Sequence, residues 1–315
     1  MRSNTLIGAL ALLGFVAFAT PASGQDTNPL FKDTKIKNYL PHMTWREVEQ
    51  ALTHTDMVVI PVGSNEQHGP HMVLGTDIFT ALETCKLLAQ RTDILIAPVV
   101  LAGVSEHHMG FPGTITLSPE TLEAVITDTA RSLIRHGFKK LLILNSHGGN
   151  APALRAAVEK INQTTSATAV LLEDLKLPEP AAKPDTNGKP AASAKPDALD
   201  IDWHAGIGET SLMLYLTPSF VDMSRAEQPT LTLPEIVRKA EAGLKADPNL
   251  GLVEDANLFR PLAANKKASS REMSSNGVFT TGDLRTATAK RGKDEVEAFL
   301  QAAVKLIEGW TAISR

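Results

Sequence analysis

The chain has 315 residues, of which 43% are hydrophobic and 21% are charged, and its formal net charge at pH 7 is −4. That length is enough for one large domain with a sizeable core. The weak acidity argues against a nucleic-acid-binding protein, which would present a basic patch. Cys85 is the only cysteine, so an intramolecular disulfide is excluded, and its apolar neighbours predict a buried residue.

Residues 1–24 have the composition of a secretory signal peptide. Arg2 gives a positive start, an uncharged and mostly apolar run follows, and Ala22-Ser23-Gly24 resembles a cleavage site. We therefore expect cleavage between Gly24 and Gln25 and a periplasmic or secreted mature chain. A membrane anchor is the alternative, but the apolar run is shorter than the roughly 20 residues that a span needs. No later stretch of the sequence is apolar for long enough to cross a bilayer.

Apolar runs and helical patterns alternate along the chain. Short branched apolar runs predict buried strands at 57–62, 94–100, 141–145 and 168–173. Helical patterns fall at 78–91, from the Ser118 N-cap to Gly137, at 151–163 and at 294–313. This alternation predicts an α/β fold with a mostly parallel sheet and helices on both faces. We expect the last helix to pack on the sheet.

Residues 175–200 differ in composition from the rest of the chain. They are rich in proline, alanine and lysine and have no large apolar residue between Leu177 and Leu199. The composition predicts a flexible surface insertion, with residues 178–197 disordered. Because chemistry-bearing residues resume directly afterwards, we interpret residues 25–315 as a single catalytic domain that contains this insertion.

Two histidine-bearing segments each follow a predicted strand, GSNEQHGPH after 57–62 and NSHGGN after 141–145. Active sites of parallel α/β sheets lie outside the carboxyl ends of the strands, so these segments should meet at one edge. Glu66 and His68 are two residues apart and would point the same way in an extended segment. Asp77 falls at the start of a helix, and His147 lies among glycines.

A third segment, WHAGIGETSLMLYL, contributes His204 and Glu209. Glu209 begins an apolar run, where a carboxylate is costly unless it is paired or binds a metal. The combined acids and imidazoles suit zinc, manganese or iron(II) rather than calcium. A bridging carboxylate would give a two-metal site that activates one water. We therefore expect one or two divalent ions.

Each of these residues also has an ordinary structural interpretation. Asp77 could simply cap its helix, and His68 could hydrogen-bond a carbonyl in a turn. A serine hydrolase is disfavoured because no G-x-S-x-G nucleophile elbow is present. A periplasmic small-molecule binding protein is the non-enzyme alternative, since export and an α/β fold suit it. Such a protein would not require clustered acids and imidazoles at the strand ends.

Four segments occur in an order that resembles the creatininase (creatinine amidohydrolase) family: PVGSNEQHGPHMVLGTD, GVSEHHMGFPGTITL, LLILNSHGGN and HAGIGETSLML. The resemblance runs from about residue 40 to the C-terminus. It implies a three-layer α/β sandwich, a divalent metal centre and hydrolysis of a carbon–nitrogen bond in a small, often cyclic amide. It also implies a symmetric homo-oligomer, with a hexamer as the expected form.

The resemblance also implies roles for individual residues. Glu66, His68, Asp77, His147 and Glu209 match metal-site positions, with Asp77 as the bridging ligand. His204 matches a histidine assigned to proton transfer and is the expected catalytic residue.

Two positions depart from creatininase itself. Gly149 stands where creatininase has a carboxylate ligand, so the metal site should rely on Glu209. Trp203 stands where creatininase has an acidic residue, and the insertion at 175–200 lies just upstream. We therefore expect a remodelled pocket rim and a substrate that need not be creatinine, with a peptide-cleaving activity as the alternative.

Overall fold

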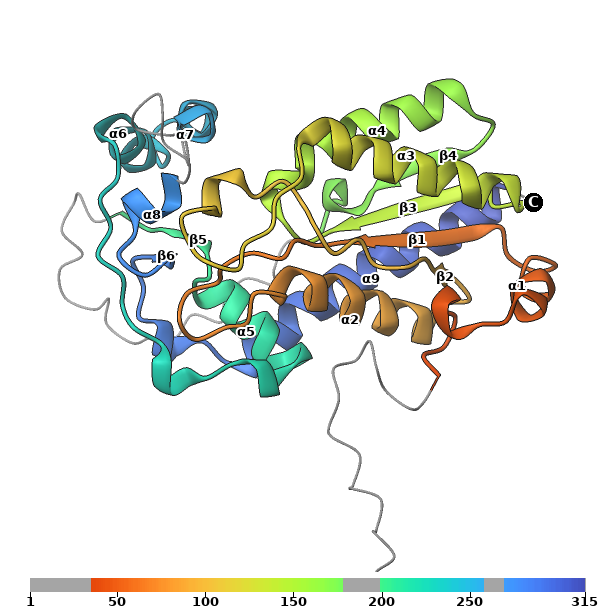
Figure 1. Ribbon diagram of the computed structural model, residues 1–315, viewed down its shortest axis with the longest axis horizontal. Coiled ribbons are helices and arrows are strands. Elements are labelled where there is room, and N and C mark those ends of the chain that lie inside the picture. The colour runs from red at the N-terminus through yellow and green to blue at the C-terminus, as the bar shows by residue number, and fades with distance from the viewer. Residues whose placement is uncertain (1–34, 178–198, 258–268, 315) are drawn as a thin grey trace, which may run out of the picture. The chain divides into compact units, whose positions relative to one another are not determined.

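The computed structural model describes residues 35–177, 199–257 and 269–314, so the expected signal peptide and most of the 175–200 insertion lie outside the described residues. Its main sheet contains β1 (Met57–Val62), β2 (Leu95–Ile96), β3 (Lys140–Asn145) and β4 (Thr168–Leu171). The strands run in the order β2-β1-β3-β4 and every pairing is parallel (Figure 1). The predicted mostly parallel sheet is confirmed.

The helices of the described residues are α1 (Trp45–Ala51), α2 (Thr76–Arg91), α3 (Pro119–Arg135), α4 (Ala151–Thr164), α5 (Ile207–Leu216), α6 (Glu235–Gly243), α7 (Gly251–Asn257), α8 (Ser269–Met273) and α9 (Ala289–Ile313). Figure 1 shows α3 and α4 on one side of the sheet and α2 and α9 on the other. These helices and the sheet form the three layers of an α/β sandwich. The main contacts of α9 are with α5 and α2.

The central strand β1 explains why the main core forms here. All its residues are buried, as expected for a strand covered on both faces. Val58, Ile60 and Val62 alternate along the strand, so they point to the same face, where they pack with apolar residues of α3 and α4. This apolar packing holds the carboxyl ends of β1 and β3 in register, with Val62 opposite Asn145.

The predicted strand boundaries need two corrections. The run 94–100 forms a regular strand only at Leu95–Ile96, although Val100 N–H still donates to the carbonyl of Pro61 at 2.9 Å. Pro98 lacks an N–H group, so continuous pairing cannot pass through it. The run 168–173 ends as a strand at Leu171 and continues as a 3-10 turn. The Ser118 cap is confirmed, because its side chain accepts from Thr121 N–H.

A second, two-stranded antiparallel sheet pairs β5 (Asp202–His204) with β6 (Phe279–Thr280). Trp203 packs with Ile201, Met273 and Phe279 in a small apolar cluster. Neighbouring residues of a strand point to opposite faces, so this packing turns His204 away from the cluster. β5 thereby delivers His204 toward the edge of the main sheet.

Candidate metal centre

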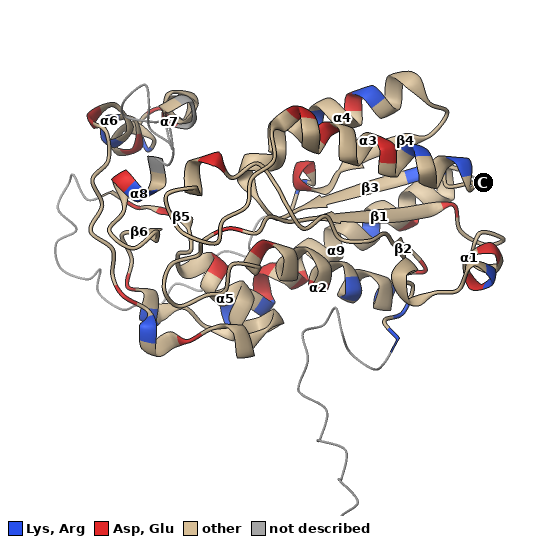
Figure 2. Cartoon of the chain, in the orientation of Figure 1, with Lys and Arg blue, Asp and Glu red and all other residues tan. Residues whose placement is uncertain are grey.

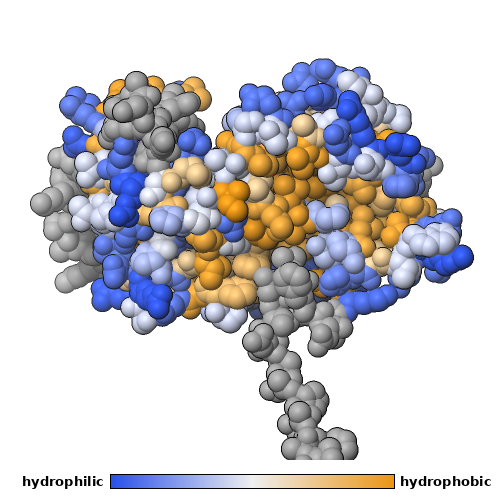
Figure 3. Space-filling view, in the orientation of Figure 1, coloured by the Kyte–Doolittle hydropathy of each residue, from blue (hydrophilic) through white to orange (hydrophobic). Residues whose placement is uncertain are grey.

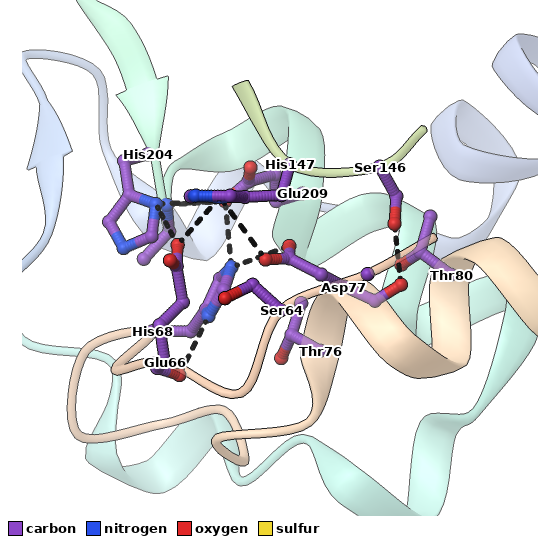
Figure 4. A network of polar contacts seen from close by, with 12 residues as sticks. Ser64, Glu66, His68, Thr76, Asp77, Thr80, Ser146, His147, His204 and Glu209 are labelled. Atoms are coloured by element: carbon purple, nitrogen blue, oxygen red, sulfur yellow. Dashed lines mark hydrogen bonds and ion pairs between the residues drawn. The ribbon is translucent and has the colours of Figure 1, made fainter. Parts of the chain in front are cut away.

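The predicted site residues come together at the carboxyl ends of β1 and β3 (Figure 4). Glu66 and His68 follow β1, and His147 follows β3. Asp77 lies in the first turn of α2, where Ser146 Oγ donates to its backbone carbonyl at 2.6 Å and ties α2 to the end of β3. The expectation that both histidine-bearing segments meet at one sheet edge is confirmed.

Glu66 presents one carboxylate oxygen to several imidazoles. Its Oε2 accepts a hydrogen bond from Ser105 Oγ. Its Oε1 lies 3.2 Å from His147 Nδ1, 3.5 Å from His108 Nε2 and 3.7 Å from His204 Nδ1. Oε1 nevertheless has no hydrogen-bond partner and is fully enclosed. This oxygen is therefore oriented toward a position where a cation would satisfy it.

Asp77 lies between two histidines. Its Oδ1 is 3.2 Å from His68 Nε2, and its Oδ2 is 3.4 Å from His147 Nδ1. Glu209 Oε2 lies 3.6 Å from the same His68 nitrogen. A carboxylate whose two oxygens face different ligand groups has the placement that bridging requires, and the bridging role itself stays a prediction.

Glu209 differs from the sequence expectation in its exposure. It lies in the first turn of α5, and its side chain is 33% exposed rather than fully buried. Its Oε2 accepts from Ala205 N–H at 2.5 Å. Ala205 has a φ of +49°, a left-handed conformation that is uncommon for a residue other than glycine. This backbone conformation, at the residue directly after His204, orients the Ala205 N–H toward the Glu209 carboxylate.

Two of the histidines are oriented by backbone carbonyls. His68 Nδ1 lies 3.2 Å from the carbonyl of Glu66, and His147 Nε2 lies 2.9 Å from the carbonyl of Val104. A carbonyl can only accept, so these nitrogens carry the protons. The other nitrogen of each ring is left to face the carboxylates. This is the usual arrangement of metal-binding histidines, in which a second contact fixes the tautomer.

His204 has a different environment. Its Nε2 lies 2.8 Å from the carbonyl oxygen of Gln67 and 2.9 Å from the side-chain nitrogen of the same residue. Gln67 Oε1 accepts from Gly69 N–H, which fixes the orientation of the amide. The Gln67 carbonyl can accept from a protonated Nε2, and the Gln67 side-chain N–H can donate to an unprotonated Nε2. Gln67 can therefore hydrogen-bond with either tautomer of His204. His204 Nδ1 faces Glu66 and also Glu209, at 3.9 Å from Glu209 Oε2.

The electrostatics of these groups indicate a missing positive charge. Burial lowers the pKa of His68, but the carboxylates of Asp77, Glu209 and Glu66 together outweigh it and raise that pKa to about 10. Burial also lowers the pKa of His147, but Glu66, with smaller contributions from Asp77 and the carbonyl of Val104, raises that pKa to about 9. Burial raises the pKa of Asp77. For His204, burial and the charge of His68 lower the pKa to about 4, so its ring is neutral at pH 7.

These residues fit a divalent transition ion. Among the described residues, enclosed side-chain atoms without a hydrogen-bond partner include Glu66 Oε1, His68 Nε2 and Asp77 Oδ2. Buried polar atoms are normally satisfied, so this concentration needs an explanation. Ligand atoms lie within 4.8 Å of one another in three groups: Glu66, His107 and His147; Glu66, His68 and His204; and His68, Asp77 and Glu209. Imidazole nitrogens combined with carboxylate oxygens favour zinc, manganese or iron(II).

Sequence reasoning missed the contribution of the segment after β2. His107 and His108 form part of a 3-10 turn, Glu106–His108, that reaches Glu66. Burial lowers the pKa of His107 to about 4 and that of His108 well below its usual range. The adjacent histidines of GVSEHH were a visible signal, but their distance from the other motifs along the chain concealed the contact. His71 lies outside these groups, with Nε2 at 2.9 Å from Thr210 Oγ1.

A pocket of about 350 Å³ reaches the centre at Asp77 and Glu209. Its apolar lining residues are Leu144, Leu172, Leu175, Leu177, Leu212, Val296 and Phe299. Glu173 and Glu295 also line it, and each is paired with an arginine, Arg155 at 3.0 Å and Arg291 at 2.8 Å. The pocket therefore offers an apolar wall beside the carboxylates of Asp77 and Glu209.

Sequence comparison relates the chain to hydrolases. A family model described as creatinine amidohydrolase matches residues 41–307. The creatinine amidohydrolase of Pseudomonas putida is 32% identical over 62% of this chain and 78% of that protein. A mycofactocin precursor peptide peptidase of Mycolicibacterium smegmatis is 31% identical over 63% of this chain and 74% of that protein.

Structural comparison gives the same fold. A creatininase structure described as the Mn form has a TM-score of 0.62 at 24% identity and covers 87% of this chain and 98% of its own. A Bacteroides fragilis structure described as a putative creatinine amidohydrolase has a TM-score of 0.60 at 21% identity and covers 87% of this chain and 96% of its own. The α/β creatininase fold predicted from the sequence is confirmed.

Proposed function

The chain belongs to the creatininase family of metal-dependent amidohydrolases, and from this premise we propose that it hydrolyses a carbon–nitrogen bond of a small linear or cyclic amide. The observation that carries the proposal is the convergence of Glu66, His68, Asp77, His147 and Glu209 at one sheet edge (Figure 4). Enclosed atoms of three of these residues, Glu66 Oε1, His68 Nε2 and Asp77 Oδ2, lack a hydrogen-bond partner. We propose zinc, manganese or iron as the metal, with one or two ions bound.

Glu66 and Asp77 would provide the negative charge that holds the ions. The ions, when bound, would supply Lewis acidity, which lowers the pKa of water and polarises a carbonyl. His204 is neutral at pH 7, so it can take up a proton at Nδ1 as water attacks and then deliver it to the leaving nitrogen. The carbonyl of Gln67 accepts from His204 Nε2–H and keeps Nδ1 directed into the site.

The pocket supports a substrate with an apolar group. Leucine and phenylalanine side chains line it beside Asp77 and Glu209, and its carboxylates Glu173 and Glu295 are already paired with arginines. Burial of an apolar group contributes about 25 cal/mol per Å² of buried surface. A peptide bond is the second candidate, because one relative is described as a peptide peptidase. An apolar side chain of a short peptide would suit the same pocket.

Elemental analysis of the purified chain tests the metal assignment, with Asp77→Ala and His147→Ala compared with the exposed-site control His136→Ala. The Asp77 variant should lose the most metal, because its two carboxylate oxygens face different candidate ligands, His68 and His147. Full metal occupancy in both site variants would contradict the assignment. The same preparations are then screened on creatinine, lactams, simple amides and short peptides. Hydrolysis of peptides alone would favour the second candidate.

We propose further that the chain is exported and acts as a homo-oligomer. Export is suggested by residues 1–24. In the described part of the chain, no helix has the length and apolar character needed to span a membrane.

The proposed homo-oligomer is supported by an apolar surface. Figure 3 shows apolar surface over the segment that joins β2 to α3, which includes the exposed residues Leu101, Met109 and Ile115. Exposed apolar patches mark interaction surfaces. Analytical ultracentrifugation of the purified chain at micromolar concentration tests the oligomer, and a monomer would contradict it.

A further inference from the structure

His107 reaches the metal centre from a segment to which the motif resemblance assigns no ligand. A ring nitrogen of His107, a carboxylate oxygen of Glu66 and a ring nitrogen of His147 all lie within 4.8 Å of one another. The rings of His107 and His147 are nearly parallel, with an interplanar angle of 5° and centroids 5.7 Å apart. The 3-10 turn of Glu106–His108 is held in place where Ser270 Oγ donates to the carbonyl of His107 at 2.6 Å.

Gly149 is packed so closely against its neighbours, His107 among them, that a side chain has no room at this position. A Cβ atom at this position would lie 2.3 Å from the carbonyl oxygen of Val104 and 2.5 Å from His147 Nε2. It would also lie 3.0 Å from Cε1 of His107. With this backbone, residue 149 therefore cannot carry the carboxylate that creatininase itself has two residues after its matching histidine. The His107 ring lies directly beside this position.

We propose that His107 is an additional metal ligand, which completes the donor set of the ion held by Glu66 and His147 in place of the side chain that Gly149 lacks. The inference rests on the proposed metal centre. With His107 as a ligand, this ion would have an imidazole where creatininase has a carboxylate. Imidazole is a softer nitrogen ligand that suits zinc, copper, iron and nickel more than magnesium, calcium or manganese. The Glu66 ion should therefore prefer zinc over manganese.

The test compares His107→Phe with the exposed-site control His136→Phe in the full chain. Phenylalanine keeps a flat ring that can stack on His147 but removes the nitrogen ligands. Zinc and manganese affinities are measured by chelator competition, and the cobalt(II)-loaded proteins are compared by visible absorption. His107→Phe should weaken zinc binding at one ion by at least roughly 10-fold to 100-fold, the loss seen even for partners outside the ligand set. It should also shift the cobalt absorption and reduce the preference for zinc over manganese.

His147→Ala separates this proposal from the metal centre itself. If His147→Ala loses metal while His107→Phe keeps wild-type affinity and an unchanged cobalt spectrum, His107 only stacks and the proposal is overturned. If neither variant loses metal, the metal centre is wrong as well. His107→Asn is the second variant should the phenylalanine chain fail to fold, and the same affinity loss and spectral shift are expected of it.

Discussion

At the scale of single residues, the site separates groups that hold charge from a group that can move a proton. His68 and His147 each donate to one backbone carbonyl, so their tautomers are fixed and their second nitrogens face carboxylates. His204 contacts both a carbonyl and an amide nitrogen of Gln67. A ring that changes protonation during turnover needs a partner that fits both forms, and Gln67 offers His204 Nε2 both an acceptor and a donor.

Alanine variants of His204 and Glu209 should therefore lose activity for different reasons. Glu209→Ala should lose metal, and activity should return in part at high metal concentration. His204→Ala should keep its metal while kcat falls roughly 10²–10⁴-fold, the usual range for a general acid or base. Metal content, kcat and KM of both variants are the measurements. A raised KM with unchanged kcat would instead make His204 a substrate-binding residue, and loss of an ion would make it a ligand.

The raised pKa values of His68 and His147 predict that metal affinity depends on pH. With pKa values of about 10 and 9, both rings hold protons at pH 7 in the metal-free site. An incoming ion must displace these protons, because a ligating histidine is neutral. Affinity should therefore rise with pH from 7 and level off above about pH 9 to 10. Chelator competition across this range, with proton release followed in weak buffer, checks the sign; an affinity that falls with rising pH would refute it.

At the scale of elements, the position of Glu209 depends on how closely α5 packs on α9. Gly292 allows this approach, because a Cβ there would lie 1.9 Å from the carbonyl oxygen of Ser211. Ser211 in turn accepts from Thr288 N–H through its Oγ at 3.1 Å, which joins the N-cap of α9 to α5. The helix that carries Glu209 is thus fixed by a contact between backbones, which leaves little freedom for the carboxylate to shift.

Gly292→Ala should consequently separate α5 from α9. Overpacking a close contact lowers the free energy of unfolding by about 1–3 kcal/mol, and here metal affinity should fall as well because Glu209 moves with α5. Gly309→Ala is the matched control in the same helix, since a Cβ there has nothing within 4 Å. It should stabilise by roughly 0.5–1 kcal/mol, the helix-propensity difference. Chemical denaturation and chelator competition measure both effects; equal stability of the two variants would contradict the close-packing argument.

At the scale of the whole molecule, the surface fits an enzyme of small substrates better than a nucleic-acid binder. Figure 2 shows Lys and Arg interspersed with Asp and Glu along the coloured part of the chain. The formal net charge of −4 points the same way. Within the described residues, Glu66 and Asp77 are two carboxylates that are buried together at the sheet edge.

Export is the prediction that belongs to the whole chain. Residues 1–24 should be removed, and mass spectrometry of the periplasmic or secreted fraction should find Gln25 at the N-terminus. The reason is the order of positive charge, apolar run and small residues in this segment. A variant with Arg2→Glu, which reverses the initial charge, should slow export. An intact chain beginning at Met1 in the cytoplasm would contradict the prediction.

The sequence by itself determined the features that depend on neighbouring residues. Buried parallel strands are continuous apolar runs, and the cap at Ser118 needs only the side chain and the next turn, so both could be predicted. The edge at which Glu66 and His147 meet also followed, because parallel strands place their carboxyl ends together. The ordered motifs were sufficient to indicate the family.

The tertiary structure decided what depends on residues far apart in the chain. Pro98 shortened a strand that composition alone favoured, and the exposure of Glu209 followed from where α5 packs. The approach of His107 to His147 came from the turn after β2, which no periodicity encodes. Local patterns specify which face of an element is apolar, but the distance between two side chains on different elements is set by how the whole core packs.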